Sequence, residues 1–227
     1  APHAGPGMQD TLFGFSQLRV RAALVPLLGA LGALAGGLLL LRRRGLFARP
    51  LSTRDGHFTL ATCAGLAAMA VAVFFALRTN VVNPDGAAFT AKFMRDVPVL
   101  GAHVTHDEML ELYLHSRFWF YANQSLGWSV ERSYQVLSCL GGGVFIFLLL
   151  RYAPRLSTNR PRLACALCMS GGYMQLFFGD IENYTLTAAW LMGYFLVSAL
   201  FLEKKVSIVV PSVVLAVATV FHVLSLV

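Results

Sequence analysis

Long apolar runs separated by short polar segments constrain the fold of this chain more than any other sequence feature. A helix needs about 20 predominantly apolar residues to cross the hydrocarbon core of a bilayer. The runs therefore predict an all-α, polytopic membrane bundle of about six transmembrane helices, formed as a single domain. The predicted spans are residues 22–41, 59–77, 133–150, 163–178, 186–202 and 206–227.

The composition supports lipid rather than water as the solvent. Only 13% of the 227 residues are charged, against about 25% in an ordinary soluble domain. The net charge of +7 could suggest nucleic acid as a partner. However, the basic residues form short clusters between apolar runs, which is the arrangement that sets topology in a membrane. Nucleic-acid binding is therefore not expected.

The basic clusters predict which side of the membrane each loop occupies. Lysine and arginine follow the first, third and fifth spans, so these three loops belong on the cytoplasmic side. Residues 78–132 and 179–185 then form external loops, and they hold eight of the 11 acidic residues. The last apolar run reaches Val227 without a polar flank, so we expect the chain to be the N-terminal part of a longer protein.

The long external loop is predicted to contain an amphipathic helix. Thr105 and Glu108 have the spacing of a capping box, with Thr105 as the N-cap. In a helix that follows, Glu108, Glu111 and His115 share one face, and an apolar and aromatic set shares another. We expect this helix, over residues 105–121, to lie on the outer membrane surface.

An acidic residue, Asp85, follows the second span in the segment Asn83-Pro84-Asp85-Gly86. Proline, aspartate and glycine are common turn residues, so a plain turn is one interpretation. The other is a carboxylate held at the membrane edge as a general base, with its pKa raised by nearby apolar surface.

A second acidic site connects the fourth and fifth spans in the segment Phe178-Gly179-Asp180-Ile181-Glu182-Asn183-Tyr184. Asp180 and Glu182 could cap two helices, or they could bind a hydroxyl-rich ligand. His222 lies about 24 Å along the sixth span, toward the same side as the acids. An ionisable residue in a span is a functional candidate, although a structural hydrogen bond to a neighbouring helix is an equal alternative.

Metal binding has only weak support in the sequence. His103, His106 and Asp107 are close together, but they need not share a helix face. Cys165 and Cys168 form a C-x-x-C pair inside a predicted span, without a second ligand pair nearby. We therefore assign no metal site, and a divalent metal ion remains an open alternative as a cofactor.

The order of these parts resembles the GT-C superfamily of membrane glycosyltransferases, the protein-mannosyltransferase-like group, over residues 59–227. In that family a span leads into a long external loop with an acidic residue near its start, followed by interfacial helices. Asp85 matches that acid. The segment from Phe178 to Tyr184 resembles the F-G-x-x-E-N-Y segment of bacterial members.

The resemblance implies transfer of a sugar from a polyprenyl-phosphate carrier to an acceptor on the extracytoplasmic face. Asp85 would be the catalytic base, and Asp180 and Glu182 would orient hydroxyl groups. By charge and location, Arg78 and Lys92 would pair with the carrier phosphate, because a leaving phosphate needs cationic stabilisation. We add His222 to the expected substrate-binding residues.

Three functions remain as hypotheses from the sequence. The first is a GT-C-like glycosyltransferase in a bacterial cytoplasmic membrane, whose partners are membrane lipid and a lipid-linked sugar donor. The second is a non-catalytic scaffold or accessory subunit that binds other membrane proteins. A transporter is the third and weakest, because transporters place polar residues near the midplane and these spans carry no acid or base there.

Overall fold

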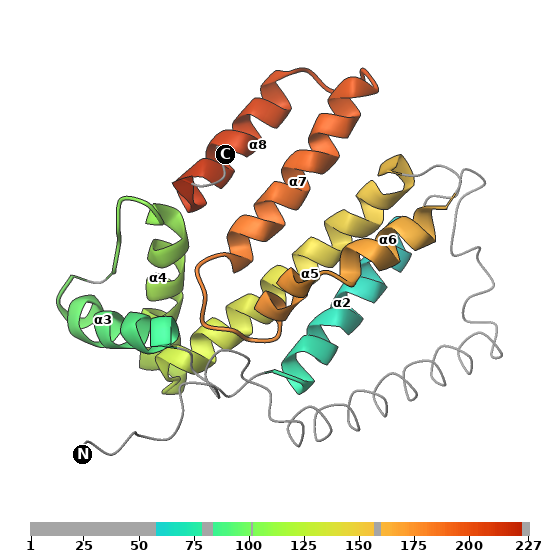
Figure 1. The fold of residues 1–227 in the computed structure, drawn as a ribbon. Helices are drawn as coiled ribbons and strands as arrows, with labels where there is room; N and C mark the ends of the chain where they lie inside the picture. Colours follow the sequence, from blue (N-terminus) through green and yellow to red (C-terminus); the bar gives the residue numbers. More distant parts are fainter. Residues whose placement is uncertain (1–57, 79–83, 101, 157–159, 224–227) are drawn as a thin grey trace, which may run out of the picture. The chain divides into compact units, whose positions relative to one another are not determined.

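The computed structural model describes residues 58–78, 84–100, 102–156 and 160–223, apart from the side chains of residues 84 and 85. These residues belong to the compact unit Leu51–Val227. The predicted first span, residues 22–41, lies outside the described part of the chain. Within that part the fold is all-helical, which confirms the all-α part of the predicted fold class (Figure 1).

The helices follow the apolar runs, with two additions in the long external loop and one interruption. Residues 163–178, predicted as one span, are split near Ser170 and Gly171 into a short α-helix and a 3-10 helix. Glycine is a poor helix former, which explains the break. The elements are α2 (Leu60–Ala76), α3 (Pro84–Leu100), α4 (Met109–Leu126), α5 (Val130–Leu156), α6 (Pro161–Met169), η1 (Gly172–Phe177), α7 (Thr185–Leu202) and α8 (Val209–Phe221).

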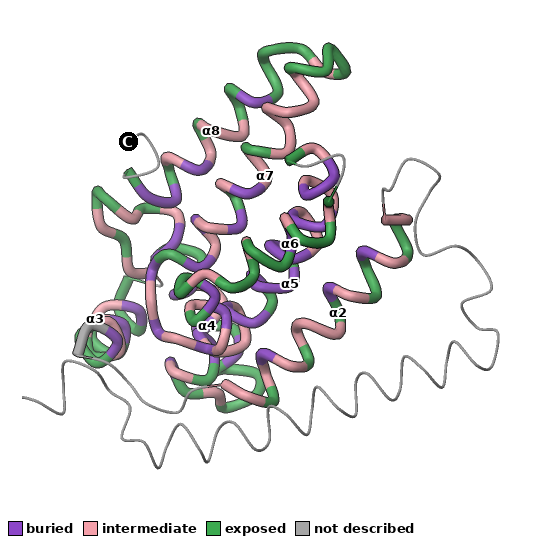
Figure 2. Tube along the Cα trace, turned by 45° about the vertical axis from the view of Figure 1, so that its right-hand side comes forward, coloured by how far each residue is buried: buried purple, intermediate pink, exposed green. Residues whose placement is uncertain are grey.

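Two of the described helices, α5 and α7, are long and apolar enough to cross a membrane. The apolar helices α2 and α8 have 17 and 13 residues, which is short for the roughly 20 that a span needs. Only 22% of the residues of α7 are buried inside the protein, and most of the others are partly exposed (Figure 2). The count of about six spans remains a prediction.

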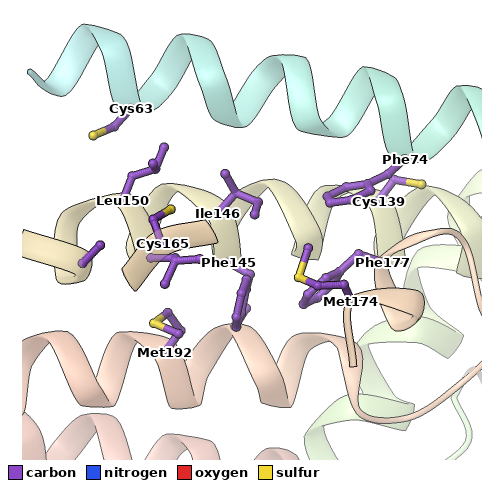
Figure 3. Packing of buried hydrophobic residues seen from close by; sticks show 13 residues of the cluster. Cys63, Phe74, Cys139, Phe145, Ile146, Leu150, Cys165, Met174, Phe177 and Met192 are labelled. Carbon is purple, nitrogen blue, oxygen red and sulfur yellow. The ribbon is translucent and has the colours of Figure 1, made fainter. Parts of the chain in front are cut away.

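Helix α5 is the central element of the described unit, and it packs against α2, α4, α6 and α7. Its glycines at 141–143 allow neighbouring side chains to approach closely. A Cβ atom on Gly142 would lie 2.6 Å from Phe177 Cβ and 2.7 Å from Phe74 Cε2. These two aromatic residues belong to the main apolar core (Figure 3).

The variant Gly142→Ala is expected to lower the free energy of unfolding by about 1–3 kcal/mol, because the added methyl group overlaps two packed phenylalanines. Gly65→Ala is the matched control: a Cβ there meets nothing within 4 Å. That exchange is expected to stabilise the helix by roughly 0.5–1 kcal/mol. Denaturant unfolding in detergent would measure both. Equal stability of the two variants would contradict the packing described here.

The segment predicted as a long external loop, residues 78–132, contains two helices, α3 and α4, where one was predicted. Pro84 begins α3, so the segment predicted as a turn is the first turn of a helix. Proline suits that position because its fixed φ matches the helix and its missing N–H is not needed there. Phe93 and Val97 of α3 are fully buried in a second apolar core, shared with α4, the start of α5 and Ile181.

Helix α4 lies with its polar face toward the protein interior. Glu111 and His115 are buried, whereas Leu114 and Tyr121 on the apolar and aromatic face are exposed. The predicted capping box is wrong, because the helix begins at Met109 and Glu108 is its N-cap. The outward apolar face suits an interfacial helix, but the inward carboxylates are the feature that organises the site.

Candidate functional site

The loop between η1 and α7, residues 179–184, is the centre of the site. Gly179 has a φ of +77°, which favours glycine. A Cβ atom there would also lie 3.0 Å from Arg78 Cβ. The Asp180 carbonyl accepts a hydrogen bond from Ser138 Oγ at 2.9 Å, and Asp180 Oδ1 accepts from Ile181 N at 3.0 Å. Helix α5 therefore fixes the first half of this loop.

Asn183 is buried and connects three elements through its side chain. The Tyr134 hydroxyl on α5 donates to Asn183 Oδ1 at 3.2 Å. Asn183 Nδ2 in turn donates to Glu108 Oε2, before α4, at 2.6 Å. A buried amide is stable only when its donor and acceptor groups are paired, and here both are. Asn183 thus joins the loop to α5 and α4.

Glu111 is fully buried and caps the N-terminus of α7 from another helix. Its Oε1 accepts from Leu186 N at 3.1 Å, and its Oε2 accepts from Thr187 N and Thr187 Oγ1, each at 3.1 Å. The first N–H groups of a helix have no partner within it, and the positive end of the helix dipole favours an acid there. Glu111 therefore completes the first turn of α7.

His222, the C-cap of α8, lies at the same site. Its Nε2 is 3.3 Å from Glu108 Oε1, and its ring stacks on Tyr184 with centroids 4.9 Å apart. Val223 N also donates to the Asp107 carbonyl at 3.0 Å. The end of α8 is thus joined to the start of α4, so acids and a histidine from three distant segments converge.

Burial changes the protonation of several groups in this region. It raises the pKa of Asp180, and hydrogen bonding by Ile181 N opposes the rise. Burial also raises the pKa of Glu111 to about 8, although the hydrogen bonds from Leu186 and Thr187 at the start of α7 act to lower it. The buried His115, whose Nδ1–H donates to the Glu111 carbonyl at 2.9 Å, has its pKa lowered to about 4 by desolvation.

These shifts predict that stability falls as pH rises from 6.5 to 8. In that window folded Glu111 keeps a proton that it loses in the unfolded chain, where its pKa is 4.5, so the loss is about 2 kcal/mol. Between pH 4.5 and 6.5, His115 acts in the opposite direction, because the unfolded chain binds a proton that the folded chain excludes.

Chemical unfolding of the wild type and of Glu111→Gln at pH 6.5 and 8 would measure this effect. The variant cannot titrate at residue 111, so its stability is expected to change less across the window. An equal loss in both proteins would show that another group causes the pH dependence.

The structure brings only some of the predicted site residues together. Asp180, Glu182 and His222 belong to the loop region or contact it, and Arg78 lies against Gly179. Arg78 donates to Phe75 O at 2.7 Å and to Gln135 Oε1 at 3.2 Å. Lys92 instead lies over the Phe89 ring on α3, 5.4 Å from its centroid.

Asp85 is in the first turn of α3, but its side chain lies outside the described part of the chain. Its predicted role as a base therefore stays a prediction. The same holds for a metal ion: among the described residues, no group of three or more His, Cys, Asp or Glu side chains is arranged to hold one. His103 Nδ1 lies 2.7 Å from Asp96 Oδ2.

Sequence reasoning missed the residues that hold the site together: Glu108, Glu111, Tyr134 and Asn183. One signal for the first two was available, because both share a helix face with His115. No comparable pattern marked Tyr134, which lies between Ser133 and Gln135 in the polar first turns of α5.

Comparison with protein-family models, curated proteins and solved structures finds no match to this chain. The relation to membrane glycosyltransferases therefore rests on the sequence motifs alone, and the function follows as a proposal.

Proposed function

We propose that the chain is a GT-C-like glycosyltransferase that moves a sugar from a polyprenyl-phosphate carrier to an acceptor on the extracytoplasmic face of a bacterial cytoplasmic membrane. The observation that carries the proposal is the contact of Glu108 with both Asn183 and His222, at 2.6 and 3.3 Å. This contact joins the predicted long external loop to the predicted short external loop and to the end of α8, which was predicted as the sixth span. Convergence of distant polar groups is what a transferase site requires.

The proposed reaction uses the carboxylates as base and orienting groups. A carboxylate, assigned to Asp85, removes the proton of the acceptor hydroxyl. The acceptor oxygen then attacks the anomeric carbon, and the bond from that carbon to the phosphate oxygen breaks. Polyprenyl phosphate leaves with the bonding electron pair. Asp180 and Glu182 orient hydroxyl groups, and the raised pKa of Asp180 makes it the second candidate for the base.

Cationic and lipid-facing parts have supporting roles in this proposal. Arg78, beside the loop, would pair with the carrier phosphate, and Lys92 and His222 would bind other parts of the substrate. The exposed apolar residues of α7, such as Phe195 and Leu202, would contact lipid. The carrier would then reach the site along the membrane.

A transfer assay on the full chain tests the proposal. The protein, purified in detergent, would be incubated with a set of polyprenyl-phosphate sugars and acceptors, and release of polyprenyl phosphate would be followed by mass spectrometry. We expect release that depends on the acceptor and co-purification of polyprenyl phosphate with the protein. Absence of both would overturn the proposal.

A non-catalytic accessory subunit is the second candidate function. One observation favours it: the carboxylate oxygens of Glu108 and Glu111 accept hydrogen bonds from within the protein, as those of purely structural residues would. Stoichiometric co-purification of other membrane proteins, together with no transfer, would support this alternative.

A further inference from the structure

The carboxylates of Glu108 and Glu111 lie on one side of the loop that carries Asp180 and Glu182. They are three residues apart, at the N-cap and in the first turn of α4. Glu108 accepts from Asn183, and Glu111 accepts from Leu186 N and Thr187 N. The two side chains thus hold the second half of the loop and the first turn of α7.

Helix α5 contacts the same loop through different residues. Ser138 Oγ donates to the Asp180 carbonyl, and the Tyr134 hydroxyl donates to Asn183 Oδ1. Asn183 therefore receives one partner from α5 and one from the start of α4. The loop is thus held by α5 and by α4 through separate contacts. Removing the contacts with α4 would free the second half of the loop and leave the hydrogen bond from Ser138 to the Asp180 carbonyl in place.

We propose that Glu108 and Glu111 are positioning residues, which hold residues 179–184 in the geometry that sugar transfer needs. This inference rests on the proposed function, and it adds two residues to the site that act through the loop. Glu111 fixes the start of α7. Glu108, oriented by His222 on its other oxygen, fixes Asn183.

The arrangement suits positioning because each acid contacts the loop or the start of α7 directly: Glu108 accepts from Asn183 Nδ2 at 2.6 Å, and Glu111 accepts from Leu186 N and Thr187 N at 3.1 Å. Glu111 is fully buried, and its oxygens receive three donors. Because Glu111 is ionised only above its pKa of about 8, the variants are compared with the wild type above that pH. Glutamine at this position has one acceptor oxygen and one NH₂ group, so a donor at Leu186 or Thr187 would face another donor. The exchange therefore weakens the contact while keeping the volume of the side chain.

Hydrogen exchange of the full chain in detergent tests the positioning directly. In Glu111→Gln, the amides of the loop and of Leu186 and Thr187 are expected to exchange at least tenfold faster than in the wild type. Glu108→Gln should accelerate exchange at Asn183 and its neighbours. The matched control is Glu203→Gln: Glu203 lies at the opposite end of α7 and pairs with Arg155 at 3.0 Å and Lys205 at 2.7 Å.

The control should leave exchange in the loop unchanged. Unchanged exchange in Glu108→Gln and Glu111→Gln as well would overturn the proposal, whether or not the wild type transfers sugar. This readout is independent of substrate, so its failure is distinguishable from failure of the proposed function.

Kinetics separate positioning from general stability. In the transfer assay, both variants are expected to lower kcat at least tenfold with the KM for the donor nearly unchanged. Glu108 should act through Asn183, so Glu108→Gln combined with Asn183→Leu should be no slower than Asn183→Leu alone. A wild-type kcat in the two variants, or fully additive losses in the double variant, would overturn the assigned role.

Discussion

Replacement of Asp85 by asparagine is expected to slow sugar transfer by about 100- to 10,000-fold, because an amide cannot take the proton of the acceptor hydroxyl. The initial rate of polyprenyl-phosphate release would measure the loss. Binding of the donor should change little, since the variant keeps the shape of the side chain. The fold should also be preserved, because the exchange alters only the first turn of α3.

Asp96→Asn is the matched control, since Asp96 lies on the same helix and bonds to Arg95 and His103. Its transfer rate should stay within a few-fold of the wild type. Asp180→Asn distinguishes the two candidates for the base. Full activity of a folded Asp85→Asn protein, with activity lost in Asp180→Asn, would move that role to Asp180.

The variant Glu111→Ala is expected to lower the free energy of unfolding by about 3 kcal/mol, because it leaves buried donors at the start of α7 without an acceptor. The truncated side chain also leaves a void beside His115. Unfolding by denaturant in detergent micelles would measure the change.

Glu203→Ala at the other end of α7 provides the comparison. Its pair with the exposed Lys205 lies at the surface, and such pairs contribute about 0–1 kcal/mol; its second partner, Arg155, is largely buried and keeps a hydrogen bond to the Arg151 carbonyl. If Glu111→Ala proved as stable as Glu203→Ala, the cap on α7 would have little energetic importance.

Patterns local in the sequence predicted the all-helical fold well. Apolar runs marked the positions of α2, α5, α7 and α8, because burial of apolar surface and backbone pairing within a helix act over neighbouring residues.

The face of α4 that points toward the protein interior could not be predicted from the periodicity of its sequence. A helical pattern separates polar from apolar faces, but it does not say which face meets the protein. Glu111 and His115 face inward because their partners lie on α7 and α5. Those partners become visible only when the helices are placed in space.

The candidate site was predicted only in part, because some of its residues are recognisable only by their partners on other helices. The acids of the short loop and His222 were identified from their sequence context, and His222 does lie beside Glu108. Asn183 and Tyr134 were not identified, because a buried hydrogen bond between residues 49 apart leaves no mark in the local pattern.

The cap on α7 has a consequence for the order in which the protein assembles. Glu111 and Leu186 are 75 residues apart, so α4 leaves the ribosome well before the helix whose first turn it completes. Until α7 has been synthesised, the Glu111 carboxylate lacks the backbone donors of Leu186 and Thr187. The cap of α4 on α7 must therefore form late, even though α4 can already pack against α3 and α5, and contacts this distant in sequence are slow to form.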